Sequence, residues 1–184
     1  MQEVYSNSEA DRGISQPVDD RGIVRTESLT LGQQKRIAEA DTFFIASFHS
    51  EIGTDASHRG GNPGFVEVVD KNTLVFPNYW GNTMFNTLGN ITENPHAGLL
   101  FIDFATGSTL QITGKAYVIW DKARISRFPG GNQAVEYHVS QAIETPHAIP
   151  LRWKFLAYSG ANPAAPVVSQ PVSSGEIHKE RSIA

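Results

Sequence analysis

Residues 57–90 read SHRGGNPGFVEVVDKNTLVFPNYWGNTMFNTLGN, and this stretch carries most of the information about the fold. Two short runs rich in β-branched and aromatic residues, Gly64 to Asp70 and Thr73 to Pro77, flank the turn-forming sequence Asp-Lys-Asn and predict two paired strands. Apolar residues then recur at helical spacing from Asn82 to Asn94, and Pro95 ends that pattern. The stretch therefore predicts a β-hairpin followed by one helix.

Strand patterns continue on both sides of this stretch. They cover Thr42 to Phe48 before it, and Ala97 to Phe104 and Thr109 to Asp121 after it. The run from Ala134 to Ile143 alternates well enough for a final long strand, and a helix stays open there. A short helix is expected between Thr30 and Asp41. Short strands joined by turns favour a closed antiparallel sheet, so the expected fold class is mostly β with a few flanking helices.

The chain length fits one domain with additional segments at both ends. It has 184 residues, of which 40% are hydrophobic and 18% charged, as in a globular protein. Residues 1–30 are polar and acidic, which is typical of an arm outside a core. Residues 161–184 are rich in Pro and Ser, as in a linker or tail. We therefore expect the folded domain to span residues 31–160.

Charge and composition exclude several classes of function. The net charge is −4 and no Lys/Arg cluster is present, so nucleic acid is not an expected partner. No run approaches the roughly 18 apolar residues of a membrane span, so we expect no membrane insertion. The chain has no cysteine, which excludes thiolate sites and disulfides and fits a cytoplasmic location. Its six histidines lack metal-ligand spacing, so no metal site is expected.

Three features are able to carry chemistry. The run from Asp55 to Phe65 combines Arg59 with glycines that let a ligand approach the backbone, although a polar hairpin loop with a solvated arginine has the same composition. Asn82 and Thr83 stand at the predicted helix start, where free N–H groups bind anions or are simply capped. Gln111 lies in an apolar strand, and faces either a heterocycle or solvent.

Taken together, the ordered motifs resemble the pyridoxamine 5′-phosphate oxidase-like flavin-binding split barrels. The resemblance spans roughly Ile37 to Trp153, and its motifs are Ser57 to Val66, Gly81-Asn82, Leu88 to Ile91, Asn94-Pro95, Gly98 to Asp103 and Gln111 to Gly114. It implies a six-stranded antiparallel split β-barrel. It also implies a homodimer that binds two flavin mononucleotides (FMN) in clefts between the subunits.

The resemblance assigns one set of residues to cofactor binding. They are Ser57, His58, Arg59, Gly60, Phe76, Pro77, Asn82, Thr83, Gln111, Arg152 and Trp153, and the sequence identifies no catalytic residue beyond His58 as a candidate. Arg59 matches the arginine of the first flavin-contacting strand. Phe76 and Pro77 fall where two strand residues flank the isoalloxazine ring, and Gln111 matches the glutamine near that ring.

The chain also departs from the family pattern. Where authentic oxidases carry an Arg-Lys pair for the flavin phosphate, this chain has Asn82 and Thr83, which favours a branch distinct from those enzymes. Arg152 and Trp153 are similar to a C-terminal Arg/Trp region of the family. His58 is the one candidate proton donor, with a structural histidine as the alternative.

Three functions follow as hypotheses. The first is an FMN-dependent oxidoreductase that takes electrons from a small molecule such as NAD(P)H or from a separate reductase. The second is a protein that binds flavin, or a related planar group such as haem or a deazaflavin, without turnover. The third is a dimeric interaction module without a ligand.

Overall fold

The computed structural model describes residues 22–79, 86–160 and 162. Its elements in chain order are β1 (Val24–Thr26), α2 (Leu31–Glu39), β2 (Thr42–His49), β3 (Gly53–Gly60), β4 (Glu67–Asp70), β5 (Thr73–Tyr79), α3 (Asn86–Glu93), β6 (His96–Ile102), β7 (Thr109–Ile119), α4 (Lys122–Ile125) and β8 (Gly131–Thr145). The mostly β, antiparallel class predicted from the sequence is confirmed. No helix in this part of the chain is both long enough and apolar enough to cross a membrane.

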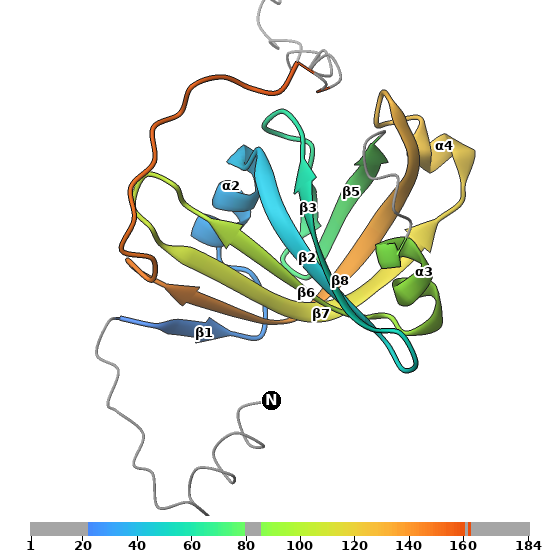
Figure 1. Cartoon of the computed structure of the whole chain (residues 1–184), viewed down its shortest axis with the longest axis horizontal. Helices are drawn as coiled ribbons and strands as arrows, with labels where there is room; N and C mark the ends of the chain where they lie inside the picture. Colours follow the sequence, from blue (N-terminus) through green and yellow to red (C-terminus); the bar gives the residue numbers. More distant parts are fainter. Residues whose placement is uncertain (1–21, 80–85, 161, 163–184) are drawn as a thin grey trace, which may run out of the picture.

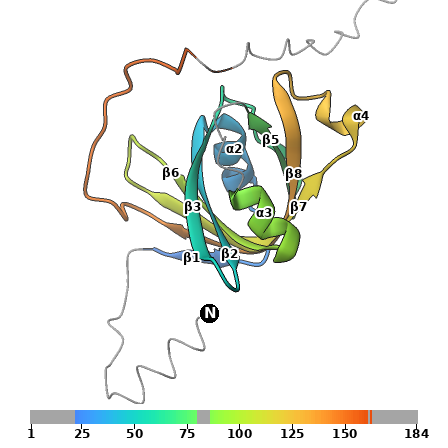
Figure 2. The ribbon, with the colours of Figure 1, turned by 45° about the vertical axis from the view of Figure 1, so that its right-hand side comes forward.

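The strands form one strongly curved sheet (Figure 1). Its order is β3-β2-β6-β7-β8-β5-β4, and β1 pairs with β8 outside this path. The six longer strands make the split barrel, whereas β1 and β4 have only three and four residues. β3 and β4 are the two edges of the sheet, and α2 and α3 lie on its concave side (Figure 2).

Helix α2 begins where the sequence places a capping residue. The Thr30 hydroxyl accepts a hydrogen bond from the Gln33 backbone N–H, and the Gln33 side chain accepts one from the Thr30 N–H, which forms a capping box. One face of the helix buries Ile37 completely in the core. α2 thus covers part of the open side of the barrel.

The interior of the barrel is built around Phe43 on β2. Its ring contacts Phe65, Phe76 and Phe101 at centroid distances of 5.8, 5.0 and 5.1 Å. Such aromatic pairs each add about 0.5–1.5 kcal/mol beyond the area they bury. Because these rings come from three strands and the β3–β4 connection, they hold distant parts of the sheet together.

The long strands β7 and β8 are bent at a bulge next to Gly114. The register shifts between Thr113 and Gly114. A Cβ atom at Gly114 would lie 2.1 Å from the His138 carbonyl oxygen and 2.8 Å from the Tyr137 ring, so only glycine fits. The buried Tyr137 hydroxyl lies 2.8 Å from the carbonyl oxygen of Ala97, and burial raises the pKa of Tyr137. The bulge lets β8 wrap around the barrel.

Most strands match the sequence-based expectations, with two corrections. The run from Ala134 to Ile143 is a strand, as favoured, and the helix left open there is excluded. The segment at Asp55, interpreted as a polar loop, is instead strand β3. That prediction was wrong because the inward-facing residues of β3 are polar, so the apolar alternation of a half-buried strand is missing. The short helix α4 was also not predicted.

Candidate functional site

Strand β3 presents polar side chains on both of its faces. Asp55, Ser57 and Arg59 alternate with the more exposed Ala56 and His58, and Asp55 and Ser57 contact helix α3. Elsewhere in the described barrel the inward positions are mostly apolar, with Ser47 on β2 and Asn78 on β5 as buried polar exceptions. A polar row on the inner face therefore marks the part of the barrel that differs from an ordinary core.

A chain of hydroxyl hydrogen bonds joins this row to α3. The Thr87 hydroxyl donates to a carboxylate oxygen of Asp55 at 2.8 Å. Because its single proton is used there, the Ser57 hydroxyl donates to Thr87 across their 2.9 Å contact. Thr87 is 2% exposed, so both bonds are shielded from water. The first turn of α3 is thereby fixed over β3.

Two further buried amides stabilise the same region. Asn90 on α3 donates to the Ser47 hydroxyl of β2 at 3.0 Å. Asn78, the residue after Pro77 on β5, donates to the Gln133 side chain of β8 at 3.3 Å. No individual role was predicted from the sequence for these residues or for Asp55 and Thr87. Each is a polar residue at a buried or half-buried position, and its burial is known only once the strand register is known.

Arg59 is the charged centre of the row. Its side chain is only 5% exposed, and its Nη1 donates to the His58 carbonyl oxygen at 3.0 Å. Burial lowers the pKa of the Arg59 guanidinium, and the charge of Asp55 acts in the opposite direction. A desolvated guanidinium gains strongly from an anion that provides oxygen atoms to its planar donors. The donor set of Arg59, with hydroxyls nearby, thus fits a phosphate group.

His58 and Gly60 lie beside each other at the end of β3. The His58 side chain points to the outer face, where its ring contacts Phe44 edge-on at a centroid distance of 5.8 Å. Its Nε2 lies 3.5 Å from the Thr42 hydroxyl. A Cβ atom at Gly60 would lie 2.8 Å from the His58 ring, so the glycine leaves room for that ring. His58 and Arg59 therefore face opposite sides of the sheet.

Phe76 and Pro77 lie in the interior of the single chain. Phe76 is 1% exposed and belongs to the cluster around Phe43. Pro77 is equally buried and pairs with Ala134 of β8. Both side chains therefore contribute to packing, and β5 presents Asn78 and the half-buried Tyr79 at its end, where burial raises the pKa of Tyr79.

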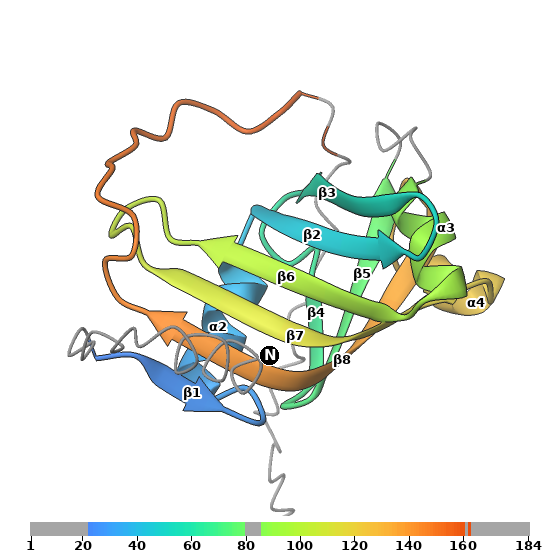
Figure 3. The same cartoon turned by 60° about the horizontal axis from the view of Figure 1, so that its bottom comes forward.

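Gln111 lies on the outer face of β7, in a row that crosses the sheet. The paired positions of this row are His58, Phe44, Leu100, Gln111, Ile143 and Arg25. Gln111 is exposed and Phe44 is 37% exposed. The neighbouring row contains small side chains, with Ala46, Ala56 and Gly98 paired across three strands. The strands that carry these rows lie side by side in Figure 3. The structure therefore places His58 and Gln111 on one largely apolar face.

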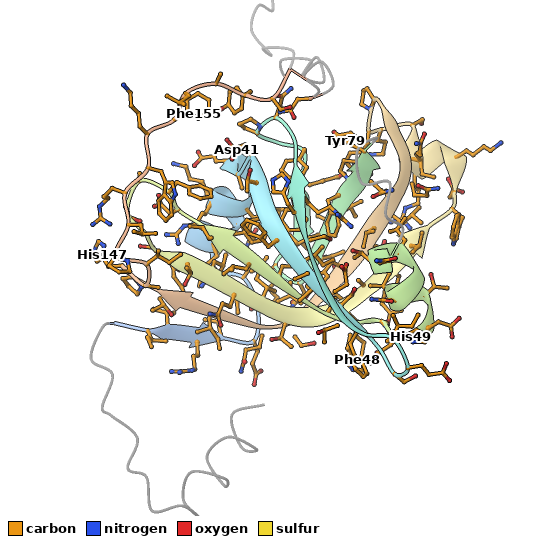
Figure 4. All side chains as sticks on the ribbon, viewed as in Figure 1. Asp41, Phe48, His49, Tyr79, His147 and Phe155 are labelled. Atoms are coloured by element: carbon orange, nitrogen blue, oxygen red, sulfur yellow. The ribbon has the colours of Figure 1, made fainter. Side chains whose placement is uncertain are left out.

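The C-terminal candidates contact a different part of the chain. The Trp153 ring packs edge-on against Phe104 at 5.0 Å, and Arg152 donates to the carbonyl oxygen of Leu151. The segment is anchored where the Ile149 N–H donates to the Gly107 carbonyl oxygen at 2.9 Å. Beyond this point it runs over the surface, as Phe155 shows in Figure 4. The described contacts of Arg152 and Trp153 are therefore with the β6–β7 side.

The two remaining candidates, Asn82 and Thr83, lie outside the described residues. The site that the structure does describe consists of the β3 row and the first turn of α3. Of the predicted residues, Ser57 and Arg59 belong to this row. Asp55 and Thr87 join them as additions from the structure.

Comparison with known proteins gives a consistent result for the fold. The family model described as pyridoxamine 5′-phosphate oxidase matches residues 32–153, about two thirds of the chain. HupZ from Group A Streptococcus, in a variant form, is 13% identical with a TM-score of 0.51, over 63% of this chain and 98% of that one. A candidate pyridoxamine 5′-phosphate oxidase from Lactobacillus delbrueckii is 16% identical with a TM-score of 0.50, over 64% and 94%. No protein with a curated description matches the sequence.

Proposed function

The chain belongs to the pyridoxamine 5′-phosphate oxidase family, and on that premise we propose that it is an oxidoreductase that binds FMN between two copies of itself. The observation that carries this proposal is the inner row of β3, where Arg59 is 5% exposed and its neighbours Asp55 and Ser57 are linked to Thr87 of α3. Arg59 would hold the phosphate, together with Asn82 and Thr83 at the helix start predicted from the sequence. The Ser57 and Thr87 protons stay in the hydrogen bonds that lead to Asp55.

The position of β3 in the sheet supports the same ligand. β3 is an edge strand that pairs with β2, and none of the described strands pairs with its other edge. Backbone N–H and C=O groups along that edge are able to hydrogen-bond the polar rim of a planar heterocycle. When bound, the flavin supplies the electron-transfer chemistry, and the protein supplies binding and orientation.

The outer face of the sheet supports a second copy as part of the site. Phe44 and Leu100 lie between His58 and Gln111 in this row, Ile143 follows Gln111 on β8, and the row of small residues runs beside them. An outer face with exposed apolar and small side chains, as Phe44 and Ala46 show, is suited to pairing with the same face of another copy. In that arrangement Gln111 and His58 lie at the boundary between subunits. Size-exclusion chromatography with light scattering is expected to give the mass of a dimer.

The absorbance of freshly purified protein tests the cofactor. Bands of oxidised flavin support the proposal, the Soret band of haem contradicts it, and a colourless protein that takes up no FMN also contradicts it. Anaerobic addition of NADH or NADPH then tests turnover. Bleaching followed by recovery in oxygen identifies an oxidoreductase, whereas no bleaching with either donor identifies a flavin carrier.

A further inference from the structure

A second cavity lies at the opposite side of α3 from the β3 row. It has a volume of about 590 Å³, within the range of roughly 300–1,000 Å³ that small-molecule sites occupy. Its walls are the β2–β3 turn with His49 and Ile52, one side of α3, Trp120 after β7 and Gln133 on β8. Figure 4 shows His49 and Phe48 at that turn, on the same side of the molecule as α3 in Figure 1.

The electrostatics of this cavity are opposite to those of the Arg59 site. Its described lining residues include Glu93 and contain no Lys or Arg. Glu93 is the last residue of α3, so the partial negative charge of the helix C-terminus adds to its carboxylate. His49 Nδ1 accepts hydrogen bonds from the backbone N–H groups of Glu51 and Ile52, which requires that nitrogen to carry no proton. The cavity therefore disfavours phosphates and attracts cations.

Trp120 gives the cavity a wall that recognises one kind of cation. Its side chain is 69% exposed although it lies directly after a barrel strand, and Ile52 across the cavity is 83% exposed. An indole face attracts ammonium and guanidinium groups through its quadrupole, and more strongly than other aromatic rings. An aromatic wall and a carboxylate in one cavity are complementary to a group that is both apolar and positively charged.

We propose that this cavity binds a small organic cation of the alkylammonium class, with its charge between the Trp120 ring and the Glu93 carboxylate. Asn86 and Gln133, which also line the cavity, offer amide groups to a hydroxyl or carbonyl of the same molecule. This site is separate from the FMN site, because Arg59, Ser57 and Asp55 are not among its lining residues.

Choline and its uncharged analogue 3,3-dimethylbutan-1-ol test the proposal, because they share size and hydroxyl group and differ in charge. Calorimetric titration of the full chain is expected to give saturable choline binding, with the alcohol at least about tenfold weaker. Absence of saturation, or equal affinity for the two molecules, overturns the proposal.

Variants of Trp120 and Glu93 test whether these two residues bind choline. Trp120→Ala and Glu93→Gln are each expected to weaken choline binding about fivefold or more, whereas Trp120→Phe keeps a ring and loses less. Glu39→Gln, an acid on α2 outside the cavity, is the matched control and is expected to change nothing. Circular dichroism confirms that each variant is folded. If both cavity variants bind choline like the control, the cation does not bind at this cavity.

Discussion

Strands β7 and β3 belong to the same barrel but use their inner faces in opposite ways. On β7 the inward positions Leu110 and Ile112 are at most 1% exposed and apolar. On β3 the inward positions Asp55, Ser57 and Arg59 are polar, and Asp55 and Ser57 are connected to α3 by hydrogen bonds. β7 lies at the centre of the sheet, whereas β3 is an edge. The closed part of the barrel therefore has the apolar packing that stabilises the fold, and the split part has the polar groups of the proposed binding site.

The difference has a physical reason. A central strand has both backbone edges paired and both neighbours contributing apolar side chains, so its inner face is dry and close-packed. A polar inner face destabilises an edge strand less than a central strand, because solvent or a ligand is able to hydrogen-bond the polar groups of the edge strand. In the polar row of β3 the Thr87 hydroxyl satisfies Asp55 and Ser57, and Arg59 is buried, which lowers the pKa of its guanidinium.

The largest expected effect is a loss of stability when a side chain on the inner face of β7 is truncated. Leu110→Ala removes a fully buried side chain from the core and is expected to lower the free energy of unfolding by about 2–5 kcal/mol. Gln111→Ala, one residue along on the outer face, is the control and is expected to change it by less than about 0.5 kcal/mol. Urea denaturation measures both. Equal effects would mean that the two faces of β7 do not differ as described.

The second largest expected effect is a loss of FMN affinity when a side chain on the inner face of β3 is truncated. Arg59→Ala is expected to weaken FMN binding by about 1.5–3 kcal/mol, the scale of a charge-assisted hydrogen bond. Fluorescence quenching of FMN measures the dissociation constant. Arg25→Ala, an exposed arginine of β1, is the control. An unchanged titration for the Arg59 variant removes Arg59 from the phosphate site.

The link between β3 and α3 is expected to contribute less. Thr87→Val keeps the shape of the side chain but removes the buried hydroxyl that bonds to the Asp55 carboxylate and the Ser57 hydroxyl. We expect this change to lower the free energy of unfolding by about 1–2 kcal/mol. Thr92→Val is the matched control, because the Thr92 hydroxyl bonds only to the carbonyl of Leu88 within the same helix. Thermal unfolding compares the two variants. If they lose equal stability, the hydroxyl chain does not hold α3.

The smallest expected effect concerns an ion pair on the outside of the barrel. A hydrogen bond from Arg124 holds the pKa of Glu136 below its ordinary value of 4.5. Because the folded-state pKa is the lower one, the pair stabilises the protein above about pH 4.5, and this stability is lost as the pH falls through the folded-state pKa. The Arg124 side chain is 48% exposed, which limits the effect to about 0.5 kcal/mol.

Arg124→Gln tests this sign directly. The variant is expected to be slightly less stable than the unchanged protein at pH 7, and the difference is expected to disappear near pH 3. A difference that persists or grows in acid would show that Arg124 acts through something other than the Glu136 carboxylate. Urea denaturation at the two pH values gives the measurement.

The sequence predicted the apolar parts of the fold better than the polar ones. Apolar alternation predicted the strands around Ile45 and Ile112, and a capping residue predicted the helix that begins after Thr30. The structure confirms these three elements. β3 was missed because Asp55 and Arg59 stand at positions where a strand pattern requires apolar residues. The same polar residues that concealed the strand make it the candidate site.

The site itself was only partly accessible from the sequence. The run around Arg59 alone also fits a polar hairpin loop, and it was assigned to a site because it stands in order with the other family motifs. Thr87 was not assigned to the site, since a threonine inside a helix has no local signature of a contact made to Asp55, 32 residues away. Gln111 was placed near the ring only through the family resemblance, and its position on the outer face comes from the register of β7 with β6.

The affinities of FMN and riboflavin for the unchanged protein test the central claim most directly. The two molecules share the ring and differ in the phosphate, which the buried Arg59 is proposed to bind. The account predicts saturable binding of both, with FMN at least about tenfold tighter, the equivalent of one charge-assisted hydrogen bond. Equal affinity for the two flavins, or no saturable binding of FMN, would contradict the assignment of the β3 row as a phosphate site.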